Sequence, residues 1–158
     1  LDGSIDRVLD QVTISNGLGW SPDGTTMYFT DTGPGRIDSF DFDPATGAMA
    51  NRREFFSGIA GRGAPDGLTV DSEGCIWTAQ WGGGVVLRLD TSGEVIGEIE
   101  MPVSRPTSCC FGGSNLDRLF ISSAKVGLDG EDLAGALMQC TPGIQGLPSR
   151  PFMGELPI

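Results

Sequence analysis

The chain has 158 residues with 25 glycines and 10 prolines, and its formal net charge of −11 argues against a nucleic-acid partner, because such a surface repels phosphate. It contains no histidine, which excludes a Ser-His-Asp triad, a Cys-His pair and an imidazole metal ligand within it. Short apolar runs cut by Gly and Pro turns predict an all-β domain, and no run is long enough to span a membrane as a helix, so we expect no membrane partner.

The first segment, residues 1–13, begins with the turn dipeptide Asp2-Gly3 and continues with Ile5, Val8 and Leu9. This pattern predicts the outermost strand of a β-sheet whose inner strands are absent. We therefore interpret residues 1–13 as the remnant strand of a preceding repeat.

Three repeats follow, which indicates a repeating architecture. They begin with residues 16–24 (NGLGWSPDG), 66–74 (DGLTVDSEG) and, more weakly, 107–115 (TSCCFGGSN). Each is followed by a strand-like run, at residues 26–30, 75–79 and 118–122. The spacing is typical of four-stranded propeller blades. We interpret Trp20 and Trp77, in the middle of predicted strands, as core residues.

The remaining strands follow from alternation and turn chemistry. Residues 36–42 and 53–56 complete the first repeat, residues 85–89 and 95–99 the second, and residues 136–140 the third. The predicted blades are residues 14–60, 61–103 and 104–158, the last including a Pro-rich C-terminal tail. Asp23, Asp43 and Asp71 are interpreted as turn residues without a further function.

Three blades and one outer strand leave two apolar faces and sheet edges uncovered. The chain is therefore either half of a longer polypeptide or must pair with a second copy to close the ring. The alternative is a compact stack of three sheets that never closes.

The four cysteines contain no C-x-x-C pair, and the neighbours Cys109 and Cys110 should point to opposite faces of a strand. Reduced thiols are expected, which favours a reducing compartment and a cytoplasmic location.

Three polar residues stand at equivalent places, one per repeat: Asn16, Asp66 and Thr107. Each begins an innermost strand, so their side chains should converge at the mouth of the channel. An amide oxygen with a carboxylate suits a hard divalent cation, Ca²⁺ first, with Mg²⁺, Mn²⁺ or Zn²⁺ as alternatives. The competing interpretation is that Asn and Asp before Gly are turn formers.

The chain contains an ordered set of motifs: residues 14–24 (ISNGLGWSPDG), 40–47 (FDFDPATG), 51–53 (NRR), 65–67 (PDG) and 107–113 (TSCCFGG). This ordered set resembles the gluconolactonase/regucalcin family of six-bladed β-propellers. The resemblance implies that Asn16 and Asp66 are two of the ligands of one divalent ion. The third family ligand, a Glu of the first blade, has no counterpart in this chain.

The resemblance also implies a metal-dependent hydrolase that opens a sugar lactone, with Asp66 as the general base for an attacking water. Trp81, Thr107 and Arg62 are candidate substrate contacts, although Trp81 would equally suit packing between blades. Two other functions stay open, namely a calcium-binding regulatory protein and an inactive truncated propeller.

Overall fold

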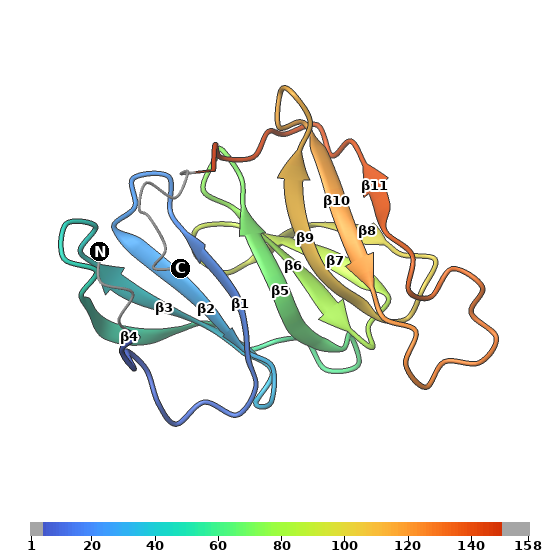
Figure 1. Ribbon diagram of the computed structural model, residues 1–158, viewed down its shortest axis with the longest axis horizontal. Helices are drawn as coiled ribbons and strands as arrows, with labels where there is room; N and C mark the ends of the chain where they lie inside the picture. The colour runs from blue at the N-terminus through green and yellow to red at the C-terminus, as the bar shows by residue number, and fades with distance from the viewer. Residues whose placement is uncertain (1–4, 150–158) are drawn as a thin grey trace, which may run out of the picture.

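The structure, a computed structural model, describes residues 5–149, and every regular element in this range is a β-strand (Figure 1). The strands form three antiparallel sheets, which we call blades 1, 2 and 3. Blade 1 contains β1 (Ser15–Trp20), β2 (Thr26–Asp31), β3 (Arg36–Phe42) and β4 (Met49–Phe56). Blade 2 contains β5 (Ala64–Val70), β6 (Ile76–Trp81), β7 (Val85–Leu89) and β8 (Val95–Glu100). Blade 3 contains β9 (Pro106–Gly112), β10 (Arg118–Ser123) and β11 (Met138–Cys140).

The first strands of the three blades, β1, β5 and β9, stand side by side, and the other strands extend outward from them (Figure 1). This arrangement confirms the predicted all-β propeller organisation. Within the described residues, no helix could cross a membrane.

Burial follows the position of each strand in its blade. Blade 2 lies between blades 1 and 3, and its second strand, β6, is buried on both faces. The outermost strand of the same blade, β8, is mostly exposed. Two apolar clusters fill the spaces between blades. The first joins Tyr28 and Ile37 of blade 1 to Leu68 and Ile76 of blade 2. The second joins Trp77 of blade 2 to blade 3, and this confirms that Trp77 is a core residue.

Two predictions about the blades differ from the structure. Blade 3 has three strands within residues 5–149 rather than four. Residues 5–13, predicted as an outer strand, form no strand because no described segment pairs with them. Instead, Leu9 and Val12 pack against an apolar cluster on the free face of blade 1. Residues 1–4 of that predicted strand, and most of the predicted C-terminal tail, lie outside the described range.

Trp20, predicted as core, is 37% exposed. It lies on the same face of β1 as Leu18, which is 48% exposed, whereas the equivalent Leu68 of β5 is 6% exposed because blade 1 packs against it. The free face of blade 1 thus carries side chains whose counterparts in the next blade are buried.

Cys109 and Cys110 point to opposite faces as predicted, the first buried and the second exposed. All four cysteines are free thiols. The Cys109 thiol donates to the Trp77 carbonyl at 3.3 Å, and burial raises its pKa.

Asp71 was expected to be only a turn residue, but its side chain is completely buried in blade 2. It accepts hydrogen bonds from the Cys75 backbone at 3.0 Å, from Trp77 Nε1 at 2.9 Å and from Arg88 Nη2 at 2.8 Å. The Arg88 guanidinium also lies 5.6 Å from the centroid of the Trp77 ring. One carboxylate therefore fixes the turn, the core tryptophan and an arginine on the third strand.

We expect Asp71→Asn to reduce the free energy of unfolding by about 3 kcal/mol, because it leaves the Arg88 charge without its buried partner. Urea unfolding measures this change. Asp90→Asn is the matched control, since Asp90 holds a similar turn through Ser92 and Glu94 but forms no salt bridge within residues 5–149. Equal losses in the two variants would contradict the assigned role of the ion pair.

Candidate metal centre

Each of the three inner strands is irregular at its start. The register with the neighbouring strand shifts between Ser15 and Leu18 in β1, between Pro65 and Leu68 in β5, and between Pro106 and Ser108 in β9. A β-bulge of this kind redirects a side chain and often marks a functional site. The bulges contain Asn16, Asp66 and Thr107, the three polar residues that the repeats predict to be equivalent.

The glycines after Asn16 and Asp66 are needed for close packing between strands. A Cβ atom at Gly17 would lie 2.6 Å from the Asp66 carbonyl oxygen and 2.7 Å from the Leu68 nitrogen. A Cβ atom at Gly67 would lie 2.6 Å from the Ser108 Cα. Neither glycine has a positive φ, and both lie within strands. The interpretation of these Asn-Gly and Asp-Gly pairs as turns is therefore wrong.

The side chains of Asn16 and Asp66 meet between blades 1 and 2. Asp66 is only 7% exposed, whereas Asn16 is exposed. Burial raises the pKa of the Asp66 carboxyl, and hydrogen bonds from the Asn16 side chain and the Gly67 backbone offset this effect only in part. Two residues fifty positions apart in the sequence thus form one polar site.

A carboxylate beside an amide is a donor set that hard divalent cations accept, so these residues fit such an ion. The site is small, however. Within residues 5–149 there is no cluster of three or more Asp, Glu, Cys or His residues that could hold a metal. Asn16 and Asp66 would therefore supply only part of a coordination shell.

Thr107 occupies the equivalent bulge in β9, but its hydroxyl is 2.8 Å from the Ser122 hydroxyl of its own blade. The packing of Gly67 against Ser108 brings this strand next to β5. Thr107 is half-buried at the start of β9, at the same end of the inner strands as Asp66.

Trp81 ends β6 and pairs with Ala64, so it lies at the same end of blade 2 as Asp66. The Arg105 guanidinium lies 5.2 Å from the centroid of its ring, and Arg105 also donates to the Val126 carbonyl. Stacking of a substrate on Trp81 would therefore have to use the ring face that Arg105 does not cover.

The structure does not bring Arg62 to the Asn16–Asp66 pair. Its guanidinium is 2.5 Å from Glu98 and 3.5 Å from Glu100, both on the outermost strand β8. These two carboxylates compete with any substrate for the Arg62 side chain, and its role as a substrate contact stays a prediction.

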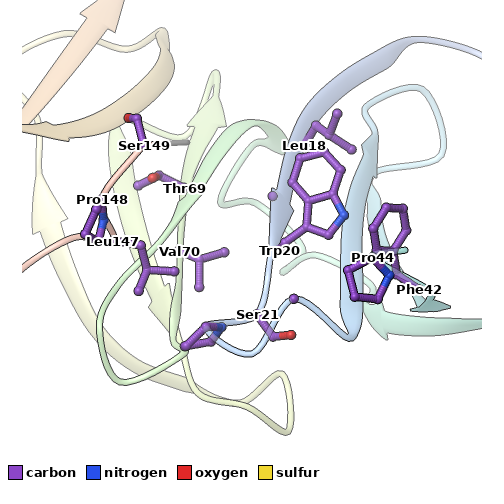
Figure 2. Close-up of a pocket in the computed structure, with 13 residues that line it drawn as sticks. Leu18, Trp20, Ser21, Phe42, Pro44, Thr69, Val70, Leu147, Pro148 and Ser149 are labelled. Carbon is purple, nitrogen blue, oxygen red and sulfur yellow. The ribbon is translucent and has the colours of Figure 1, made fainter. Parts of the chain in front are cut away.

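A groove of about 760 Å³ lies at the opposite end of β1 and β5, away from Asp66 (Figure 2). Leu18 and Trp20 form one side, and Val70 and Leu147 form the other. Its lining is mostly apolar and includes neither Asn16 nor Asp66. The groove is therefore separate from the candidate metal centre.

Two further residues hold the site and escaped the sequence-based prediction. The Asp31 carboxylate accepts hydrogen bonds from the backbone N–H groups of Thr13 and Ile14, directly before β1. The Thr32 hydroxyl links Asn16 to Pro65. The repeat offered no signal for either, because blade 2 has Gln80 and Trp81 at these places.

Comparisons with known proteins agree with this organisation. Residues 1–125 match the family described as SMP-30/Gluconolactonase/LRE-like region. Regucalcin from Gallus gallus is 40% identical over 160 positions, which cover 97% of this chain and 54% of that protein. Regucalcin from Sus scrofa is 38% identical over the same extent. The chain therefore spans about half the length of the curated relatives it matches.

Solved structures are similar as well. The structure of a calcium-binding protein, regucalcin, from Agrobacterium tumefaciens matches with a TM-score of 0.84 and 33% identity, over 92% of this chain and 51% of that one. A gluconolactonase from Xanthomonas campestris matches with a TM-score of 0.63 and 35% identity, over 76% of this chain and 38% of that one.

The raised pKa of Asp66 predicts that the stability of the metal-free protein depends on pH, because ionisation of this buried carboxyl lowers the free energy of unfolding. A carboxyl whose pKa is higher in the folded state stabilises the fold below its unfolded pKa of about 3.9, and this contribution is lost as the pH rises through the folded pKa. We therefore expect metal-free Asp66→Asn to be at least as stable as the wild type at pH 7.

Thermal melting with a chelator at pH 3 and pH 7 checks this expectation. The melting temperature of Asp66→Asn minus that of the wild type should be larger at pH 7 and should shrink toward pH 3. A variant that melts below the wild type at pH 7 would show that the Asp66 charge stabilises the fold.

Proposed function

Because this chain belongs to the SMP-30/gluconolactonase/LRE-like family, we propose that it forms part of a divalent-metal-dependent hydrolase that opens a sugar lactone. The observation that supports the proposal is the meeting of Asn16 and Asp66 at adjacent β-bulges. Since the chain spans about half of its curated relatives, the activity is proposed for the whole protein.

In this proposal Asn16 contributes its amide oxygen and Asp66 its carboxylate to the cation. When bound, a divalent cation supplies polarisation of a carbonyl oxygen and stabilisation of the negative charge that develops on it. We propose Ca²⁺ first, because one relative is described as a calcium-binding protein, with Zn²⁺, Mg²⁺ and Mn²⁺ as alternatives.

Asp66 is also the candidate general base, which would accept a proton from the attacking water. Its raised pKa favours proton acceptance, but contact with a cation would oppose it because the carboxylate charge is then partly neutralised. We therefore assign Asp66 the ligand role first and the base role second. Trp81 and Thr107, at the same end of the inner strands, are the candidate substrate contacts.

A calcium-binding regulatory protein is the second candidate function. It is favoured by the description of the Agrobacterium tumefaciens relative as a calcium-binding protein. Both candidates use Asn16 and Asp66, so only turnover separates them. The four free thiols support the cytoplasmic location that we propose for either one.

We also propose that further blades cover the free face of blade 1 in the whole protein. Leu18 and Trp20 are exposed there, while the equivalent Leu68 and Val70 of β5 are buried. The cover would come from the other half of a longer polypeptide, with a second copy of this chain as the alternative.

Addition of a divalent cation to chelator-treated protein should restore the opening of an aldonolactone, followed by acid release at constant pH. Asp66→Ala should abolish both ion binding and turnover, whereas Asp90→Ala, in a turn at the other end of blade 2, should change neither. If the protein binds the ion but none of the four cations supports turnover, the calcium-binding function is favoured instead.

The solution mass tests how the free face is covered. If the other half of a longer polypeptide covers it, the 158-residue chain should sediment at dilute concentration as a monomer of 16.6 kDa. A stable species of twice that mass would favour pairing with a second copy.

A further inference from the structure

Thr32 is the residue through which blade 1 and blade 2 are joined beside the candidate metal centre. It directly follows β2, and its hydroxyl donates to the Pro65 carbonyl oxygen at 2.8 Å. The same hydroxyl oxygen accepts a hydrogen bond from Asn16 Nδ2 at 3.2 Å. Its backbone N–H donates to the Ile14 carbonyl at 3.1 Å. Thr32 thus contacts the residue before Asp66, the residue Asn16 itself and the segment before β1.

The directions of these hydrogen bonds determine the orientation of the Asn16 amide. A threonine hydroxyl has one hydrogen, and a carbonyl oxygen can only accept, so the Thr32 hydrogen is committed to Pro65. Toward Asn16 the Thr32 oxygen can then only accept. The amide must therefore present its Nδ2 group to Thr32, which turns its Oδ1 atom away from the hydroxyl.

The contact with Asp66 agrees with this orientation. A carboxylate oxygen only accepts, so the hydrogen bond from the Asn16 side chain to Asp66 also uses Nδ2. The Nδ2 group therefore faces both Thr32 and Asp66. Among the described residues no hydrogen bond involves Asn16 Oδ1, the atom that a hard cation would use.

The hydroxyl of Thr32 is not required for the blade itself. At the equivalent place in blade 3, the backbone of Ala124 donates to the Arg105 carbonyl at 3.0 Å, as the backbone of Thr32 does to Ile14. Ala124 has no hydroxyl, yet the same backbone bond forms. The Thr32 hydroxyl is therefore an addition at the one junction where Asn16 and Asp66 meet.

We propose that Thr32 is a positioning residue of the metal centre, which holds the Asn16 amide with Oδ1 available to the cation and fixes the spacing between the two strands that carry Asn16 and Asp66. This inference rests on the proposed function, because it assumes that Asn16 and Asp66 bind a divalent ion. Outer partners that orient ligands commonly change metal affinity by 10- to 100-fold when they are removed.

The test compares Thr32→Val, which removes the hydroxyl but keeps the shape, with Thr32→Ser, which keeps the hydroxyl. Thr91→Val, in the exposed turn between β7 and β8, is the matched control. Calorimetric titration with Ca²⁺ and with Mn²⁺ should show binding weakened about 10-fold or more in Thr32→Val. Thr32→Ser and Thr91→Val should stay within about twofold of the wild type, since neither loses the hydroxyl of Thr32.

A second measurement needs no metal. The side-chain amide of Asn16, identified by the signal that Asn16→Asp removes, is followed by ¹H–¹⁵N NMR in the metal-free protein. Its hydrogens should exchange slowly with water in the wild type and in Thr32→Ser, and rapidly in Thr32→Val. Circular dichroism melting of each variant verifies that it is folded; if Thr32→Val fails to fold, Thr32→Ala takes its place.

Wild-type affinity in Thr32→Val, equal weakening in Thr32→Ser and Thr32→Val, or an unchanged Asn16 amide signal would each overturn the inference. The failure of the proposed function is distinct from these results. In that case the wild type itself binds neither ion, while the NMR comparison still decides whether Thr32 orients the amide.

Discussion

The close approach of neighbouring inner strands is the constraint on which the rest of the structure depends. β1 and β5 come so near to each other that Gly17 has no room for a side chain, and Gly67 is restricted in the same way against β9. This proximity allows the bulged residues Asn16 and Asp66 to share one site. It also brings the Thr32 hydroxyl within reach of Pro65 on the next blade. Packing between blades and the chemistry of the site are thus consequences of the same two glycines.

Much of the fold follows from the sequence because strands and tight turns are local features. The predicted strands at residues 36–42 and 85–89 coincide with β3 and β7. The predictions fail where a neighbour decides the outcome. Residues 5–13 have an apolar pattern but no described strand to pair with, and Trp20 has the pattern of a core residue but lies on a face that no described blade covers.

The candidate site was likewise predictable from the sequence only in part. Equivalence between repeats was enough to select Asn16 and Asp66, because position in a repeat determines position in a blade. The contacts of long side chains were not predictable, since they depend on partners remote in sequence. Arg62 forms a salt bridge with Glu98 on the outer strand, and the Arg105 guanidinium covers one face of the Trp81 ring. Thr32 and Asp31 stand where the repeats diverge, so no comparison between blades could identify them.

Ser108 has a consequence for the symmetry of the whole assembly. It occupies the position in β9 that glycine occupies in β1 and β5, and it is exposed. Its side chain lies against β5, because a Cβ atom at Gly67 would collide with the Oγ and Cβ atoms of Ser108. The joint between β5 and β9 is therefore filled by a hydroxymethyl group. At the joint between β1 and β5, by contrast, a Cβ atom at Gly17 would meet the backbone of β5 and the Thr30 hydroxyl. The two described joints between inner strands are thus closed by different groups, and the repeats are not interchangeable there.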